Sequence, residues 1–142
     1  MGYKQVDILT SNQLHDLFRL FQTEWWTEGR KLLDVEIMVE HSDIIVGFIS
    51  AETEELIGFA RVLTDFVYKA FIFDVIVNKQ YRGQLLGREI VDAILNHPKL
   101  QGVKHFELYC RAEMVPFYKK WGFTEELGAL YLMRKELDIT RG

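Results

Sequence analysis

The sequence predicts an α/β protein with one mixed β-sheet and helices on both faces. Two β-branched and aromatic runs, residues 43–51 and 56–64, are separated by four polar residues, the spacing of an antiparallel hairpin. Further along, strand-like runs at 71–77 and 106–110 flank a helical pattern. Such a strand-helix-strand crossover joins parallel strands of one sheet. The sheet is therefore expected to be mostly antiparallel with one parallel pair.

The composition fits a single globular domain over residues 1–142. Hydrophobic residues make up 49% of the chain and charged residues 27%. No stretch approaches the ~20 apolar residues of a membrane span, so we expect a cytoplasmic protein with no membrane partner. A net charge of −4 disfavours a broad basic face for nucleic acid. One cysteine and four scattered histidines show no metal-ligand spacing, so no metal is expected.

Two helices are expected before the hairpin. Residues 3–9 are typical of a short strand, and Thr10 and Gln13 have the spacing of a capping box that opens a helix. That helix is expected to bury residues at helical spacing: Leu14, Leu17, Phe18 and Phe21. A second helix over 30–40 is expected to turn three apolar side chains to the core: Leu33, Ile37 and Met38.

The second half of the chain predicts two more helices and two strands. Leu86, Ile90 and Ile94 recur every four residues, as on the buried face of a helix, and the following His97-Pro98 ends it. After the strand at 106–110 comes a short helix over 116–121, stopped by Gly122. Residues 130–137 predict a last strand.

The turn at residues 80–88 has the features of an anion site. It lies where a strand ends and a helix begins, so the first N–H groups of the helix have no partner within it. Gly83 and Gly87 allow close approach of the backbone, and three cations lie nearby: Lys79, Arg82 and Arg88. A diphosphate matches this pattern, although an ordinary strand-to-helix connection is the alternative.

Two segments together resemble the GNAT acetyltransferase superfamily. Gln80 and Gly83 match its Q/R-x-x-G-x-G/A turn, and a second segment, F-Y-x-x-x-G-F, matches at Phe117, Tyr118, Gly122 and Phe123. The resemblance covers nearly the whole chain, with two departures. Leu85 stands where the family usually has Gly or Ala, and Arg111 stands where many members carry an Asn that reaches the pantetheine arm. The resemblance implies the GNAT-like acyl-CoA N-acyltransferase fold, with acetyl-CoA as acyl donor and a primary amine as acceptor, in a small molecule or a protein, by direct attack in a ternary complex. It assigns contacts with acetyl-CoA to Val75, Ile76, Val77, Arg82, Gly83, Gln84, Leu85, Leu86, Gly87, Arg88, Phe117 and Tyr118.

The resemblance also supplies the acid of the reaction. Tyr118 is the family-matched residue that protonates the leaving thiolate, although packing against neighbouring aromatic residues is its alternative role. For the base, Asp74 interrupts an apolar strand on the predicted face of Ile72 and Ile76. It is either a general base or a carboxylate paired with Arg61 or a backbone amide.

Other candidates are weaker. Glu107 is a second base candidate and Asp65 a third. Cys110 is read as a small buried hydrophobe in a core strand, not as a nucleophile.

The resemblance also implies an acceptor site in the region between the first two helices. Aromatic faces and carboxylates attract a cationic amine, and the expected substrate-binding residues are Trp25, Trp26, Glu28 and Glu107. The alternative is that one tryptophan caps the core and the other rests on the surface. A non-catalytic acyl-CoA-binding or sensing module is the rival function. Edge strands of the sheet can also pair two copies as a homodimer.

Overall fold

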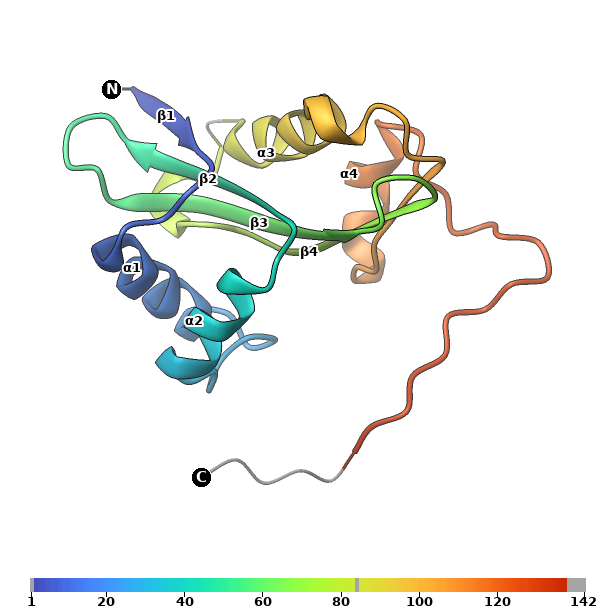
Figure 1. Ribbon diagram of the computed structural model, residues 1–142, viewed down its shortest axis with the longest axis horizontal. Helices are drawn as coiled ribbons and strands as arrows, with labels where there is room; N and C mark the ends of the chain where they lie inside the picture. The colour runs from blue at the N-terminus through green and yellow to red at the C-terminus, as the bar shows by residue number, and fades with distance from the viewer. Residues whose placement is uncertain (1, 84, 138–142) are drawn as a thin grey trace. The chain divides into compact units, whose positions relative to one another are not determined.

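A computed structural model of the chain describes residues 2–83 and 85–137, which fall into two compact units, Met1–Leu108 and Tyr109–Gly142 (Figure 1). The first unit contains the sheet. Its elements, in chain order, are β1 (Tyr3–Val6), α1 (Ser11–Gln22), α2 (Leu32–Glu40), β2 (Ile44–Ser50), β3 (Leu56–Thr64), β4 (Lys69–Val77), the 3-10 turn η1 (Lys79–Tyr81), α3 (Leu86–Leu95), η2 (Pro98–Leu100) and β5 (His105–Glu107). The second unit contains η3 (Ala112–Met114) and α4 (Val115–Lys119).

The sheet confirms the predicted fold class. Its five strands lie in the order β1-β2-β3-β4-β5. The pairs from β1 to β4 are antiparallel, and β4 with β5 is parallel, because α3 connects them as a crossover. Helices α1 and α2 cover one face and α3 the other (Figure 1).

Helix α1 begins where the sequence predicts. The Thr10 hydroxyl accepts a hydrogen bond from the Gln13 backbone N–H at 3.2 Å, and the Gln13 side chain accepts one from the Thr10 N–H at 3.0 Å. Leu17 and Phe21 are fully buried. They belong to the core that α1 and α2 build on the sheet, with Leu20, Val35, Ile45, Ile49, Leu56, Phe59 and Ile76.

Helix α2 buries a different face from the one predicted. Leu33 is 66% exposed and Ile37 45% exposed, whereas Val35 is buried, and Met38, as predicted, packs partly against the core. The sequence LLDVEIMVE places apolar residues all round this helix. Its periodicity therefore does not select a face, and the contacts with α1 do.

Helix α3 packs as its periodicity predicts. Leu86, Ile90 and Ile94 are buried. Gly58 of β3 lets the helix lie close, since a Cβ there would come within 3.1 Å of the Leu86 and Ile90 side chains. Close packing holds the N-terminus of α3 against the end of β4.

Two predictions about the later strands are wrong. Of the run 106–110, only Phe106 and Glu107 lie in β5, and residues 130–137 form no strand. Leu130 to Met133 are 67–89% exposed. A strand needs a hydrogen-bonded neighbour as well as apolar side chains, and none pairs with this segment among the described residues.

The short helix of the second unit is confirmed as α4, and Gly122 follows it with φ +90°.

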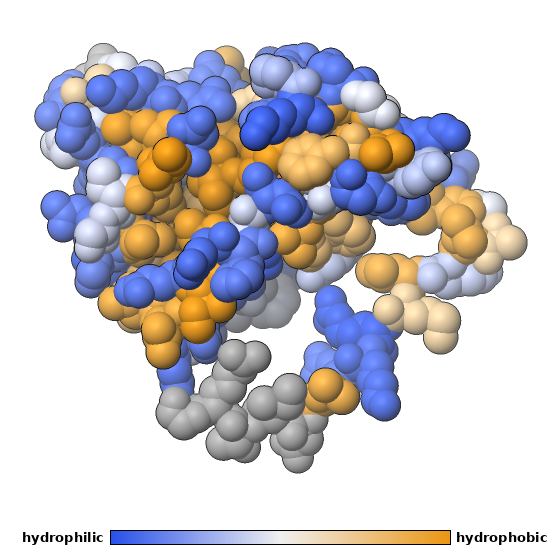
Figure 2. Space-filling view, in the orientation of Figure 1, coloured by the Kyte–Doolittle hydropathy of each residue, from blue (hydrophilic) through white to orange (hydrophobic). Residues whose placement is uncertain are grey.

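Figure 2 shows apolar side chains reaching the surface among hydrophilic ones. Within residues 2–83 and 85–137, every helix is too short or too polar to span a bilayer.

Candidate acyl-CoA site

The end of β4 presents an edge that β5 does not cover. The described ladder between the two strands runs only from Lys69 opposite His105 to Phe71 opposite Glu107, whereas β4 continues to Val77. We call the uncovered side of residues 72–77 the open edge. Backbone N–H groups on such an edge are available to a ligand.

Alternation decides which N–H groups lie on the open edge. The Asn78 N–H donates to the Ile57 carbonyl on β3 at 2.8 Å. Since successive residues of a strand direct their backbone groups to opposite sides, Val77 and Val75 face the open edge. Ile76 faces β3, and its side chain is buried in the core. Of the three strand residues predicted to contact acetyl-CoA, two thus present their N–H groups.

A β-bulge interrupts β4 at Asp74. Phe59 pairs with Ile76 and Arg61 with Phe73, so Ala60 stands opposite two residues, Asp74 and Val75. Asp74 has φ +59°, a left-handed conformation that costs an L-residue about 1–2 kcal/mol. The bulge lies within the uncovered part of β4.

The bulge also changes which side chains share a face. Phe73 lies opposite Arg61 and Ile76 opposite Phe59, and these β3 residues are two apart, so both pairs face α1. Ile72, opposite Val62, faces the other way. The prediction that Ile72 and Ile76 share a face with Asp74 is therefore wrong for Ile72, because the extra residue reverses the alternation.

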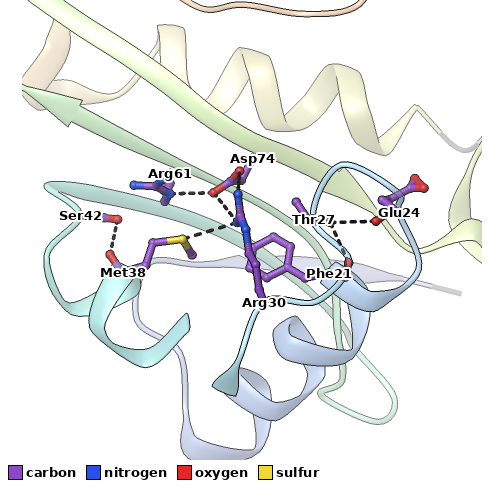
Figure 3. Close-up of polar contacts among 8 residues, drawn as sticks. All are labelled: Phe21, Glu24, Thr27, Arg30, Met38, Ser42, Arg61 and Asp74. Carbon is purple, nitrogen blue, oxygen red and sulfur yellow. Dashed lines mark hydrogen bonds and ion pairs between the residues drawn. The ribbon is translucent and has the colours of Figure 1, made fainter. Parts of the chain in front are cut away.

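The Asp74 side chain is held by two arginines (Figure 3). Arg30 donates from Nη1 to Oδ2 at 3.0 Å and from Nη2 to Oδ1 at 3.1 Å, and Arg61 donates from Nε to Oδ2 at 2.8 Å. The Asp74 side chain is only 6% exposed. The pairing with Arg61, one of the two alternatives from the sequence, is present, and Arg30 adds a bidentate partner.

Aromatic faces fix both guanidinium groups. Arg30 lies 4.6 Å from the centroid of the Phe21 ring, and Arg61 lies 4.7 Å from that of Phe73. Arg30 also donates to the Met38 sulfur at 3.6 Å. Both Asp74 oxygens therefore accept charge-assisted hydrogen bonds. We call Arg30, Asp74 and Arg61 the bulge cluster.

The other base candidates are also occupied. Glu107 forms an ion pair with Lys69 at 2.9 Å on the surface of the sheet. Asp65 accepts hydrogen bonds from the N–H groups of Val67, Tyr68 and Lys69, and these bonds lower its pKa. Its role in the structure is to shape the turn between β3 and β4.

The turn after β4 is the segment predicted to bind a diphosphate. The Asn78 side chain caps η1 by accepting from the Gln80 N–H at 2.9 Å. Gly83 has φ +87°, and nothing lies within 4 Å of the position of its absent Cβ. Gln84, a predicted contact, lies outside the described residues.

Helix α3 starts without a side-chain cap. Leu85 occupies its N-cap position with φ +64° and is 60% exposed. The N–H groups of Leu86, Gly87 and Arg88 form the first turn, where a helix offers donors and a partial positive charge to an anion. The start of α3 therefore offers backbone donors to an anion, although a leucine takes a conformation that favours glycine.

An ion pair connects this turn to the loop after α1. Arg82, whose side chain is 48% exposed, binds Glu24. The loop is anchored by buried Thr27, whose hydroxyl donates to the Phe21 carbonyl at 2.7 Å.

The loop leaves its predicted acceptor residues at the surface. Trp25 is 66% exposed, Trp26 is 41% exposed, and Glu28 is exposed. Neither tryptophan is buried in the core, and Trp26 is the less exposed of the two.

Tyr118 lies on α4 in the second unit. It is buried, and its ring packs against Phe117 at 5.0 Å and Phe123 at 6.0 Å. Burial first, and Cys110 second, raise the pKa of Tyr118 to about 12. Its hydroxyl therefore remains protonated at neutral pH.

Cys110 differs from its prediction. It is exposed and lies outside β5, not in a core strand. Partial burial of the thiol and the nearby Glu125 raise its pKa. A raised pKa leaves less thiolate, which disfavours a nucleophilic role.

Sequence reasoning missed Arg30 and Lys69. Arg30 is 44 residues from Asp74, and no local pattern connects them. Lys69 gave no signal either, because its ion pair with Glu107 depends on where the parallel strands meet. Across the described residues, no three His, Cys, Asp or Glu side chains gather as metal ligands would.

Comparison with known proteins identifies relatives of this chain. Residues 11–123 match the model of the Acetyltransferase (GNAT) family. The uncharacterized N-acetyltransferase ycf52 of Pyropia yezoensis is 29% identical over 123 residues, covering 83% of this chain and 70% of that protein. A ycf52-like protein of Prochlorococcus marinus is 31% identical over 115 residues, covering 80% of this chain and 63% of that one. A solved structure assigned to the GNAT family, from Xanthomonas campestris, superposes with a TM-score of 0.79 at 27% identity, covering 96% of this chain and 94% of that one.

Proposed function

Since this chain belongs to the GNAT acetyltransferase family, we propose that it transfers the acetyl group of acetyl-CoA to an amine by direct attack, with the thioester at the open edge of β4 and the diphosphate at the start of α3. The observation that carries this proposal is the continuity of the two features. Val75 and Val77 lie on the open edge, and the chain runs from them through η1 into the uncapped helix. One extended ligand can meet both.

The open edge supplies stabilisation for the reacting carbonyl. When an amine attacks a thioester, negative charge develops on the carbonyl oxygen, and a fixed backbone N–H lowers the energy of that charge. Val75 is the second residue of the bulge and follows Asp74 directly, so its N–H is the donor assigned to this oxygen. The N–H of Val77, two residues further along the strand, is assigned to the pantetheine arm of CoA next to the thioester.

Tyr118 is assigned, through its match to the family motif, to the leaving thiolate. Its pKa of about 12 keeps the hydroxyl protonated, whereas an ordinary thiol has a pKa of ~8.5. Complete proton transfer from the phenol to the thiolate is therefore unfavourable, because the pKa of the phenol lies more than three units above that of the thiol. Tyr118 acts as a hydrogen-bond donor that stabilises the thiolate until solvent protonates it.

The amine must lose a proton before or during attack. Asp74 and Glu107, the two leading base candidates, both form ion pairs with arginine or lysine side chains. We therefore assign this proton to water, so the reactive species is the neutral fraction of the acceptor. The exposed loop with Trp25, Trp26 and Glu28 favours a cationic acceptor, since aromatic faces and carboxylates attract ammonium groups.

The test is a calorimetric titration of acetyl-CoA into the wild type and the Gly83→Glu variant. The new carboxylate would lie in the turn assigned to the diphosphate, and like charges repel. Wild-type binding in the micromolar range, weakened at least about tenfold in the variant, is the expected result.

Gly128→Glu is the matched control. Gly128 also has a positive φ, +67°, and nothing lies within 4 Å of its absent Cβ, so the backbone strain is alike. Its affinity should stay within about twofold of the wild type. Equal loss in both variants would assign the effect to strain, and no binding by the wild type would refute the function.

A further inference from the structure

The bulge cluster suggests a role for Asp74 different from that of a base. We propose that Asp74 is a positioning residue: its carboxylate, clamped by Arg30 and Arg61, holds the β4 bulge in the conformation that presents the Val75 N–H to the thioester carbonyl. This inference rests on the proposed function of the open edge. It gives Arg30 and Arg61 the same task.

The backbone needs something to hold it. Asp74 has φ +59°, and the neighbouring residues Phe73 and Val75 belong to an extended strand. Aspartate and asparagine enter the left-handed region more readily than other residues with a Cβ. Conformational tolerance alone does not fix a bulge, because a regular strand remains accessible to the same chain.

The side-chain bonds supply that constraint. Three hydrogen bonds of 2.8–3.1 Å reach the carboxylate from two directions, one guanidinium from the loop after α1 and one from β3. The guanidinium groups are themselves seated on Phe21 and Phe73. A regular strand at Asp74 would turn the carboxylate away from these cations, so the cluster stabilises the bulged form.

The position of the bulge links this constraint to chemistry. Val75 is the residue immediately after Asp74, and alternation directs its N–H to the open edge. A preorganised donor stabilises a developing oxyanion without reorganisation during the reaction. The cluster lies on the α1 side of β4 and acts on the open edge only through the backbone.

The experiment compares the affinities of CoA and acetyl-CoA for Asp74 variants. The two ligands share the diphosphate, and only acetyl-CoA has the thioester carbonyl, so the ratio of their dissociation constants reports the Val75 contact. The wild type should prefer acetyl-CoA by about fivefold, the worth of one hydrogen bond. Asp74→Asn tolerates the left-handed region but offers one acceptor oxygen where the carboxylate offers two, so it should keep about half of this preference.

Asp74→Ala should reduce the preference to about one, with CoA affinity within about twofold of the wild type. If Asp74 acted only as a general base, its replacement would leave the ratio of the two dissociation constants unchanged. Equal ratios in the wild type, Asn and Ala proteins would overturn the inference. So would a wild type that binds both ligands equally well, whereas a wild type that binds neither would overturn the proposed function as well.

Arg30→Lys keeps the test decisive if Asp74→Ala does not fold. Lysine retains the charge but cannot contact both carboxylate oxygens as a fork. The preference should fall by about half in this variant while its circular dichroism remains that of the wild type. A folded Arg30→Lys protein with the full wild-type preference would contradict the clamp.

Discussion

The bulge at Asp74 and the turn at Leu85 are both built on a left-handed non-glycine residue, but they are stabilised in different ways. Asp74 is clamped by two guanidinium groups and is 6% exposed. Leu85, with φ +64°, is 60% exposed and makes no side-chain cap for α3. The acyl end of the proposed site is therefore constrained by side chains, whereas the diphosphate end relies on backbone donors.

This difference matches the two tasks. A donor to a developing oxyanion must be fixed within a narrow geometry. A diphosphate carries several oxygens and full charges, so helix N–H groups and arginines bind it with less strict placement. Mutations at the bulge are therefore expected to have large effects, and mutations at the diphosphate turn small ones.

The largest expected effect is on stability at the bulge. Asp74→Ala leaves two partly buried guanidinium groups without their carboxylate, and the free energy of unfolding should fall by about 3 kcal/mol. Glu54→Ala is the control, because Glu54 also has a positive φ, +62°, but its ion pair with Lys4 is exposed and 4.0 Å long. Its loss should stay below about 1 kcal/mol. Urea unfolding measures both, and equal losses would show that the clamp adds nothing.

Substitution of Tyr118 should separate chemistry from binding. Tyr118→Phe removes the hydrogen bond to the thiolate, so kcat should fall roughly 10²-fold with acetyl-CoA affinity unchanged within about twofold. Tyr109→Phe, an exposed tyrosine of the same unit, is the control and should retain wild-type activity.

The pH profile tests the same assignment. The pKa of Tyr118 is raised to about 12, so its donor form is present below that value and is lost only as pH rises through it. Wild-type kcat should rise as the amine acceptor deprotonates and show no descending limb up to about pH 10. A descending limb below that pH which disappears in Tyr118→Phe would contradict the raised pKa.

Much of the fold follows from local patterns. Thr10 and Gln13 form the predicted capping box, and Leu86, Ile90 and Ile94 form the predicted buried stripe, since each depends on neighbours within one turn. The face of α2 did not follow, because its apolar residues surround the helix. The last strand, 130–137, was wrong because composition does not supply a pairing partner.

The site divides in the same way. The strand-turn-helix backbone around Gly83 was predicted, because the turn residues are contiguous in sequence, and its role in binding a diphosphate stays a prediction. The bulge was not predicted, since its clamp joins Asp74 to Arg30 across 44 residues. An acidic residue within the apolar run FIFDVIV was the only local signal, and it allowed both a base and an ion pair.

A smaller effect should come from relieving the turn. Leu85→Gly removes the steric cost of a left-handed leucine, which offsets the greater freedom of glycine in the unfolded chain, so stability should change by less than about 1 kcal/mol. Leu33→Gly is the matched control: Leu33 is similarly exposed but lies in the first turn of helix α2, and its replacement should cost up to about 1 kcal/mol. Thermal unfolding compares them. A Leu85→Gly loss as large as that of Leu33→Gly would show that the turn is not strained.

The smallest effect concerns the ion pair between Glu24 and Arg82. Glu24→Gln frees Arg82 for the diphosphate, so acetyl-CoA affinity should rise about two- to threefold at low salt and less at high salt. Glu28→Gln removes the same charge from an exposed side chain four residues away and should change affinity less. Weaker binding by Glu24→Gln would mean that Glu24 orients Arg82 instead of competing for it.

The most direct test of the account is an amide NMR titration of the ¹⁵N-labelled protein with CoA and then with acetyl-CoA. Both ligands should shift the amide signals of Leu86, Gly87 and Arg88, which form the first turn of α3. Only acetyl-CoA should add a further shift at Val75. Shifts confined to other parts of the chain, or a Val75 signal that does not distinguish the two ligands, would contradict the placement of the thioester at the bulge.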